Sequence, residues 1–406
     1  MWELISSNQR KSVVLFILLG LCLAVMGYGF GSYYAPDGGG IFGLGMAVSV
    51  WLILSSLAYF SGDSIMLSVG HAKEVKRETH PQLYNVVEEM KIAANLPAMP
   101  KIYIIDDEAM NAFAVGRNPQ NSAIAVTAGL LAKLNRDELQ GVIAHEMSHI
   151  VNRDSMYMTF AGVTLGVITL MSNIFWWQGR LGGMRYRYNS RGNSSGGGGQ
   201  AIILVVSLVF MILGAILARL LYFAISRRRE YLADASAVRL TRYPEGLASA
   251  LEKISISPVQ LAAANKVTAP LYISNPLKSQ NLSSLESTHP PIAERIKILR
   301  GMTFGAGLAN YQDAFEKITG RHSGLIPQSA LKDKTAVNIR KPGEQDTKTT
   351  PVDSRRALGD LLMTVNNYLF INCTCGLKIK VPPNLDQKQI ICPKCGHEYP
   401  LNAQAS

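Results

Sequence analysis

The sequence has 406 residues and a formal net charge of +11, and 48% of its residues are apolar while only 17% are charged. Soluble globular proteins usually carry about 25% charged residues, so this composition argues against an ordinary soluble protein. The charge deficit is concentrated in four apolar stretches, which indicates an integral membrane protein with room for two or three domains.

Two apolar stretches near the N-terminus, 12–31 and 40–62, each reach the length of about 20 residues that a membrane-spanning helix needs. A signal peptide is the alternative for the first, but its apolar run is long for a signal and no A-x-A-like cleavage site follows. The loop between them has no Lys or Arg, whereas the outer flanks do. Both the N-terminus and the chain after residue 62 should therefore face the cytoplasm.

The segment 72–155 is predicted to lie outside the membrane and to combine helices with strands. A helical pattern fills 80–97 and ends at a proline, and residues 101–105 are rich in β-formers. Residues 111–115 and 122–129 flank the turn-rich sequence GRNPQN, so we expect them to form a hairpin.

The helix that follows the hairpin carries a candidate metal site. Asn135 can cap this helix, with Glu138 as its capping-box partner. His145 and His149 are four residues apart, so both rings lie on one helix face and can bind one metal ion. Glu146 is turned by about 100° from His145, where it can reach a water on the metal. This HExxH pattern is typical of hydrolytic zinc sites in which the carboxylate is the general base.

Two more apolar stretches, about 157–177 and 201–225, follow the HExxH helix. The glycine-rich link between them contains four arginines and no acidic residue, which breaks the positive-inside tendency if the link lies outside. Either the first two spans set the orientation or this hairpin crosses the membrane incompletely, and the sequence leaves both open.

An antiparallel arrangement of these two stretches would bring the end of the HExxH helix and the residues after 225 to the same membrane face. Glu230 could then complete a His-His-Glu zinc site that keeps one coordination position open. Asp234, one helical turn later, can accept a hydrogen bond from the free ring nitrogen of a ligand histidine. For Glu230 and Asp234 taken alone, a solvated helix face is the alternative.

Four stretches within residues 70–300 carry a family resemblance: PQLYNVVEEMKIAANLPAMPKIYIIDDEAMNAFAVGRNPQNSAIAVTAGLL, HEMSH, RRREYLADASAVRLT and THPPIAERIKIL. They resemble the membrane zinc metallopeptidases of the HtpX type, which are related to the type I CAAX prenyl proteases. The resemblance implies a gluzincin-type fold, one catalytic zinc and proteolysis of misfolded or membrane-embedded proteins on the cytoplasmic side. It puts the metal ligands at His145, His149 and Glu230 and the general base at Glu146.

The resemblance also implies residues that contact the substrate. The family's Asn-Ala edge strand falls on Asn111 and Ala112, where a polypeptide would add as an extra strand through main-chain hydrogen bonds. An ordinary core strand is the alternative for 111–115. His289 matches the family's His-Pro element, as a transition-state donor or a reversible fourth zinc ligand, and a capping or packed histidine is the alternative there.

The C-terminal tail contains a second candidate metal site. A C-x-C pair and a C-x-x-C pair, each followed by glycine, are typical of a zinc ribbon with a closed structural site; the four residues are Cys373, Cys375, Cys392 and Cys395. Four unpaired surface thiols are the alternative. A module of about 40 residues has too little core to fold alone, so the metal would supply much of its stability.

We therefore expect an α+β, mainly helical membrane protein with about four transmembrane helices, a cytoplasmic gluzincin-type peptidase domain and a small zinc ribbon. The expected divisions are an N-terminal transmembrane hairpin (1–68), the first half of the peptidase domain (69–155), a second transmembrane hairpin with its glycine-rich link (156–226), the second half of the peptidase domain (227–325), a disordered linker (326–360) and the zinc ribbon (361–406).

The predicted function is that of a membrane-bound, ATP-independent zinc endopeptidase of protein quality control, with one catalytic and one structural zinc. The partners would be unfolded or membrane polypeptides and the lipid bilayer. The protein would be multi-pass in the inner membrane, with the active site and the ribbon in the cytoplasm. The alternative is a non-catalytic membrane adaptor that recruits a partner through its ribbon. A tethered nucleic-acid binder is a third possibility, although no basic-aromatic pattern supports it, and the sequence does not indicate an oligomeric state.

Overall fold

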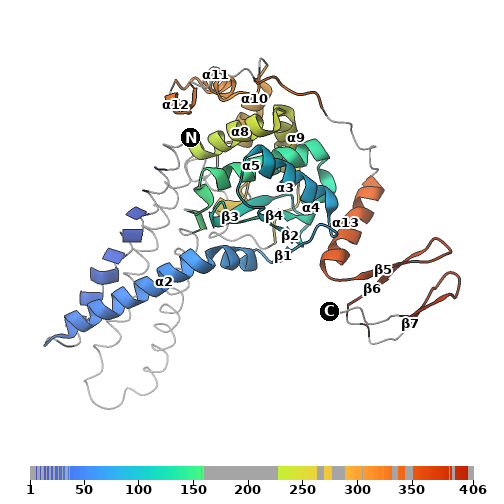
Figure 1. The fold of residues 1–406 in the computed structure, drawn as a ribbon, viewed down its shortest axis with the longest axis horizontal. Coiled ribbons are helices and arrows are strands. Elements are labelled where there is room, and N and C mark those ends of the chain that lie inside the picture. The colour runs from blue at the N-terminus through green and yellow to red at the C-terminus, as the bar shows by residue number, and fades with distance from the viewer. Residues whose placement is uncertain are drawn as a thin grey trace, which may run out of the picture.

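The computed structural model describes scattered positions up to residue 35 and then residues 37–156, 158–159, 227–262, 269–276, 289–303, 305–322, 324–331, 337–342, 351–383, 385 and 389–400. These parts form a long N-terminal helix, a four-stranded sheet covered by helices, and a small β module near the C-terminus (Figure 1). The predicted mixture of helix and sheet is therefore confirmed.

Helix α2 (Gly39–Val69) is the one helix in the described part of the chain that is long and apolar enough to cross a membrane. It contains the predicted span 40–62, and its 31 residues extend about 46 Å, well beyond the roughly 30 Å of a bilayer core. Phe16 lies against its middle, where the Trp51 indole donates a hydrogen bond of 3.2 Å to the Phe16 carbonyl. The third and fourth predicted spans lie almost entirely outside the described residues.

Four strands form one mixed sheet. Their spatial order is β1 (Ala72–Glu74), β2 (Lys101–Ile105), β4 (Asn121–Thr127) and β3 (Ala112–Asn118). β2 and β4 run parallel, and the other neighbouring pairs are antiparallel. β3 and β4 are the hairpin that the turn-rich sequence predicts, and β3 is an edge strand.

Helices cover the sheet around a central helix, α5 (Arg136–Val151). α5 begins with the predicted capping box, in which Asn135 and Glu138 satisfy each other's backbone N–H groups. It packs against the sheet and against three other helices, which are α3 (Pro81–Ala93), α8 (Arg227–Thr241) and α9 (Pro244–Ile256). Nearly every side chain from Glu138 to Ile150 is consequently buried.

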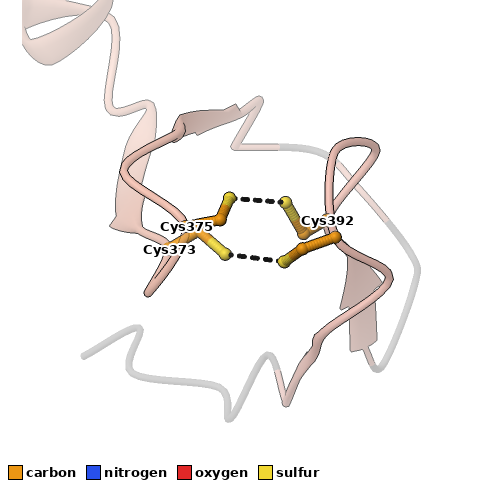
Figure 2. A group of neighbouring side chains, drawn as sticks. Cys373, Cys375 and Cys392 are labelled. Atoms are coloured by element: carbon orange, nitrogen blue, oxygen red, sulfur yellow. Dashed lines mark hydrogen bonds between the residues drawn. The ribbon is translucent and has the colours of Figure 1, made fainter.

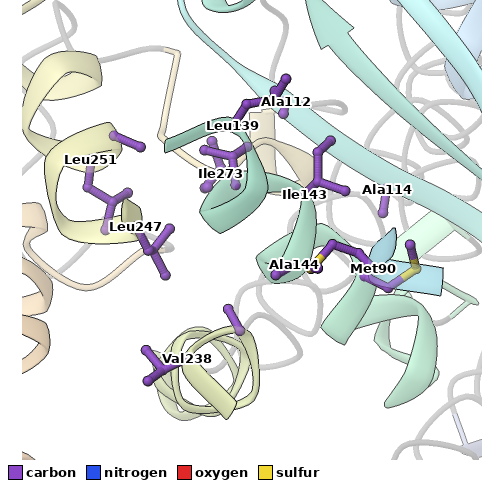
Figure 3. Close-up of a cluster of buried hydrophobic side chains, with 14 of the residues drawn as sticks. Met90, Ala112, Ala114, Leu139, Ile143, Ala144, Val238, Leu247, Leu251 and Ile273 are labelled. Atoms are coloured by element: carbon purple, nitrogen blue, oxygen red, sulfur yellow. The ribbon is translucent and has the colours of Figure 1, made fainter. Parts of the chain in front are cut away.

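The hydrophobic core is built around α5 (Figure 3). Ile143 and Ala144 contribute to it from α5, Ala112 and Ala114 from β3, and other fully buried aliphatic side chains from α3, α8 and α9. Burying a Leu, Ile or Val side chain stabilises a fold by about 1.5–3 kcal/mol. The helix that carries the HExxH pattern is therefore held rigidly on all sides by apolar contacts.

The remaining helices of this body are short. They are α4 (Ala128–Lys133), the 3₁₀ turn η1 (Ala269–Leu271), α10 (Ile292–Arg300), α11 (Leu308–Thr319) and α12 (Gln328–Leu331). α10 packs against α9 and α11, so the segment after residue 289 returns to the core. This return brings residues of α10 next to α8.

The stretch 326–360 was expected to be disordered, but parts of it have regular structure. α12 lies within it, and α13 (Pro351–Val365) begins inside it and packs on α4. Leu358, Leu361, Leu362 and Val365 lie on one face of α13 and contact the core. These four apolar residues have helical spacing, but this spacing was not recognised in the sequence because the neighbouring residues are polar.

After α13 the chain forms two small hairpins. One consists of β5 (Leu369–Asn372) and β6 (Lys378–Val381), and the other of β7 (Gln389–Ile391) and β8 (Glu398–Pro400). Lys378 and Lys380 of β6 both bind the Asp360 carboxylate of α13, at 2.6 and 2.8 Å. The helix thus connects the hairpins to the rest of the fold (Figure 1).

The contact between α5 and α9 leaves no room for a side chain at Gly141, so Gly141→Ala should lower the free energy of unfolding by about 1–2 kcal/mol. A Cβ there would lie 2.7 Å from the backbone nitrogen of Leu247. Thermal unfolding of the purified protein in detergent measures the effect.

The matched control is Gly359→Ala in α13, where a new Cβ would meet nothing within 4 Å. It should leave the unfolding temperature unchanged or raise it, because alanine has the higher helix propensity. Equal behaviour of the two variants would contradict close packing at Gly141.

Candidate metal and catalytic site

Three metal-binding side chains meet where α5 and α8 cross. His145 and His149 project from successive turns of α5, and their Nε2 atoms are 3.3 Å apart. Glu230, in the first turn of α8, approaches both: its Oε2 is 3.6 Å from His145 Nε2 and its Oε1 is 3.7 Å from His149 Nε2. Sequence reasoning expected this meeting of segments that are about 80 residues apart in the chain.

The spacing of these atoms fits a tetrahedral zinc ion. Ligands at about 2.0–2.1 Å from such an ion lie about 3.3 Å from each other. One ligand atom from each of His145, His149 and Glu230 lies within 4.8 Å of the others, and Glu230 Oε2 is buried without a hydrogen-bond partner. Buried polar atoms are nearly always satisfied, so an ion is a fitting partner for this oxygen.

Each histidine has a carboxylate on its other ring nitrogen. Asp234 Oδ1 is 3.0 Å from His145 Nδ1, as the sequence predicts for a residue one turn after Glu230. Asp154 Oδ2 is 3.2 Å from His149 Nδ1. Such contacts direct Nε2 toward a metal. Sequence reasoning missed Asp154, and its only signal was its position directly after the HExxH helix.

Arg295 of α10 is the second residue that sequence reasoning missed. Its side chain is fully buried and binds Asp234 through two hydrogen bonds, Nε to Oδ2 at 2.8 Å and Nη2 to Oδ1 at 2.7 Å. Its Nη1 donates to the Ile273 carbonyl at 3.2 Å and lies 3.8 Å from Glu230 Oε2. A buried arginine needs such partners, but the residues near Arg295 in the sequence do not indicate which distant groups they are.

The surrounding charges set the protonation of the metal-free site. Burial would lower the pKa of His145, but the carboxylates of Asp234 and Glu230 outweigh it and raise this pKa to about 9. Burial would also raise the pKa of Glu230, but the nearby histidines, His289 first among them, hold it well below its usual value. Without metal at neutral pH, His145 is consequently protonated and Glu230 is charged.

Glu146 differs from the other acidic residues of the site. It is buried beside the two histidines, and neither of its carboxylate oxygens has a hydrogen-bond partner. Burial raises the pKa of Glu146, although the charges of His145 and His149 act in the opposite direction. A carboxylate with these properties, next to a metal-binding group, is suited to accept and return a proton.

His289 is buried close enough to the site for its charge to act on Glu230. Burial lowers the pKa of His289 itself. The residues that precede it, 277–288, lie outside the described part of the chain. Its role as a donor or as a reversible ligand stays a prediction.

The edge of β3, where a substrate strand was expected to add, already has a partner from the same chain. The Ile273 N–H donates to the Ala112 carbonyl at 2.9 Å, and Phe113 forms a bridge with Tyr272. The Asn111 side chain donates to the Ser274 carbonyl at 2.9 Å. Residues 272–274 thus use hydrogen-bonding groups of Asn111 and Ala112 that the sequence suggested for a substrate.

The four C-terminal cysteines form a second group, held between the two small hairpins (Figure 2). Cys373 Sγ lies 3.3 Å from Cys395 Sγ, and Cys375 Sγ lies 3.7 Å from Cys392 Sγ. Sulfur atoms around a tetrahedral zinc are about 3.8 Å apart. Hydrogen bonding from Tyr399 is the main reason why the pKa of Cys373 falls to about 5, while the pKa of its neighbour Cys395 rises to about 12, so without metal the pair holds one thiolate and one thiol.

Two turns of the cysteine group depend on glycine. Gly376 and Gly396 have φ angles of 83° and 75°, and each donates its N–H to a cysteine carbonyl, that of Cys373 and that of Cys392 respectively. Left-handed backbone of this kind favours glycine. This explains why a glycine follows each cysteine pair in the sequence.

The raised pKa of His145 predicts how zinc affinity depends on pH. Zinc must displace the proton from His145, so affinity at this site should rise about tenfold per pH unit from about pH 6.5 and level off near pH 9. Competition with a chelator measures it, in a Cys375→Ser background that removes binding by the cysteine group. An affinity that is already constant above pH 7 would contradict a protonated His145.

Comparisons with known proteins agree with this geometry. The sequence matches the model of Peptidase family M48 over residues 77–303. The Protease HtpX homolog of Dictyoglomus turgidum is 47% identical over 308 residues, which are 74% of this chain and 94% of that protein. The Protease HtpX homolog of Streptococcus uberis is 41% identical, over 74% of this chain and 100% of that protein.

A crystal structure of S. mikatae Ste24p aligns with 74% of this chain and 67% of that chain, at 19% identity and a TM-score of 0.36, which is too low to establish a common fold by itself. The family match covers more than half of the chain, and the HtpX relatives exceed 40% identity over most of their length. The chain therefore belongs to peptidase family M48 and is a zinc metalloprotease.

Proposed function

We propose that this protease cleaves unfolded or membrane-associated polypeptides at a zinc ion held by His145, His149 and Glu230, with Glu146 as the general base. One observation carries the proposal: three ligand-type side chains lie together beside a buried carboxylate that has no partner of its own. An unpartnered buried carboxylate costs folding free energy, so its presence favours a catalytic role.

The division of work follows from the chemistry of the groups. Zinc bound here supplies Lewis acidity, which lowers the pKa of a water toward about 7 and polarises the substrate carbonyl. Glu146 accepts the proton of the attacking water and returns it to the amine that leaves when the peptide bond breaks. Asp234 and Asp154 hold the imidazoles of His145 and His149 in the tautomer that directs Nε2 inward.

Substrate binding at β3 would use main-chain hydrogen bonds, which are independent of the side chains of the polypeptide. Residues 272–274 occupy that edge, so a substrate strand at Asn111 and Ala112 must first displace them. His289 would then be free to donate a hydrogen bond to the developing oxyanion or to bind the metal between turnovers. Broad specificity of this kind suits the removal of misfolded proteins without ATP.

The proposed setting is the membrane, with α2 as one of four spans and with the catalytic group and the cysteine group on the cytoplasmic side. The length and apolar surface of α2 support one of these spans. A second zinc at the four cysteines would stabilise the two hairpins, which have little core of their own. The proposed units of the chain are those that the sequence predicts, except that the stretch 326–360 contains α12 and the start of α13, which packs on the body of the protease.

The role of Glu146 predicts that Glu146→Gln lowers the cleavage rate of casein by at least about 100-fold, because the variant lacks the proton acceptor. Its zinc content should equal that of wild type, since the amide leaves all three ligands in place. Fluorescent casein fragments and elemental analysis measure the two quantities on the same sample.

Glu88→Gln on α3 is the control, since it removes a half-exposed carboxylate that is paired with Arg77 and is not part of the metal-binding group, and it should cleave casein at the wild-type rate. Residual activity near wild type in Glu146→Gln would show that another group is the base. Absence of any zinc-dependent cleavage in wild type would instead favour the adaptor alternative.

The two metal groups predict about two zinc ions per chain in wild type and about one in each of two single variants. Glu230→Gln should lose the catalytic zinc together with casein cleavage. Cys375→Ser should lose the structural zinc and keep cleavage. Elemental analysis after gel filtration gives the counts.

Thermal unfolding separates a lost ligand from a lost fold in this experiment. Each variant should keep a cooperative transition of the protease body. A wild-type content of one zinc, unchanged in Cys375→Ser, would overturn the structural zinc and leave the catalytic one intact.

A further inference from the structure

A cavity of about 640 Å³ lies where α2 meets the hairpin and the end of the catalytic helix, outside both metal groups. Val13 and Leu52 form part of its apolar wall, and Phe60 lies at its edge. These three side chains are 50–65% exposed, so the wall opens to the surroundings of α2. Two arginines, Arg117 and Arg153, also line the cavity.

In the described part of the chain neither arginine forms an ion pair, although Asp63 lines an adjoining pocket together with Arg117. Arg117 is the next-to-last residue of β3, and Arg153 lies two residues after the end of α5. Both arginines are half-buried. Among the residues that the structure describes, neither guanidinium has a carboxylate within the 4.0 Å that defines an ion pair. Half-buried cations without a counter-charge favour an anionic ligand.

The cavity is organised around the Arg117 guanidinium. It lies over the rings of Tyr59 and Phe60, 5.7 and 5.6 Å from their centroids, which restricts where its N–H groups can point. Ser55 also lines the cavity, and its buried hydroxyl has no hydrogen-bond partner among the residues that the structure describes. A ligand with phosphate oxygens would satisfy groups that the chain itself leaves open.

We propose that this cavity binds an anionic phospholipid of the membrane, with its phosphate at Arg117 and Arg153 and its acyl chains along Val13, Leu52 and Phe60. The inference rests on the proposed placement of α2 in the membrane. The apolar wall distinguishes a lipid from a free phosphate, which would contact the arginines alone. Basic pockets beside transmembrane helices on the cytoplasmic side suit such headgroups.

The position of the two arginines connects this lipid to the protease site. Arg117 belongs to β3, the strand at which a substrate is proposed to add. Arg153 precedes Asp154, the carboxylate that binds His149. A single phosphate held by both arginines would therefore tie the β3 hairpin to the end of α5, so that the membrane itself supports the geometry of the site.

The test uses the full-length, zinc-loaded protein in a mild detergent, titrated with phosphatidylglycerol, phosphatidylcholine or inorganic phosphate and observed by native mass spectrometry. Phosphatidylglycerol should be retained with at least about tenfold higher affinity than either of the others. Arg117→Gln should reduce that affinity about tenfold, as expected for loss of one charge-assisted contact.

Arg77→Gln is the matched control, because Arg77 also lies over an aromatic ring, 5.4 Å from the centroid of Tyr84, but outside the cavity. It should leave lipid affinity unchanged. Equal affinity for phosphatidylglycerol and phosphatidylcholine would overturn the proposal, as would equal loss in Arg77→Gln and Arg117→Gln. Full competition by inorganic phosphate would make the cavity a phosphate site and would overturn the lipid assignment.

Alkaline carbonate extraction of membranes that contain the protein separates this inference from the proposed location. Release of the protein would refute the membrane placement of α2. Retention in the membrane without preferential phosphatidylglycerol binding would refute the lipid site alone.

Discussion

A buried set of opposite charges at the crossing of α5, α8 and α10 is the constraint on which the site depends. In the metal-free protein Arg295 and protonated His145 balance Glu230 and Asp234, and all four are sheltered from water. Removing one member of such a set leaves a buried charge without a partner, at a cost of about 3–5 kcal/mol. The observed crossing of the three helices satisfies these charges, and the same crossing brings the ligand atoms together.

The same charges link the metal-binding group to the edge of β3. Arg295 binds Asp234, which orients His145, and it also holds the Ile273 carbonyl beside β3. A change at the edge strand can thus reach the imidazoles through one guanidinium. If a substrate displaces residues 272–274 as proposed, this connection would carry the change to the metal-binding group.

The two metal groups contrast in how they are held. His145, His149 and Glu230 project from long helices that the core fixes, so their geometry depends on the whole fold. The four cysteines come from tight glycine turns in two short hairpins, whose strands contact little beyond Asp360 and one another. Metal would organise the second group, whereas the fold organises the first.

Local spacing explains which features were predictable. The capping box, the hairpin, the apolar span within α2 and the HExxH face all follow from residues within a few positions of each other, and each is present. The prediction of Glu230 as a metal ligand required one further assumption, which is that two distant segments meet at one membrane face. Asp154, Arg295 and the packing of α13 were missed, because their partners are set by contacts between distant helices.

The sequence by itself determined that this chain has an apolar membrane helix, a helix with the HExxH pattern and a module with four cysteines. It could do so because periodicity and motif spacing are local properties of the chain. The tertiary structure alone decided that Arg295 balances the charges of the site and that residues 272–274 cover the β3 edge. Those contacts depend on how buried helices and strands cross, and a low-dielectric interior makes them strong only when the partners come together.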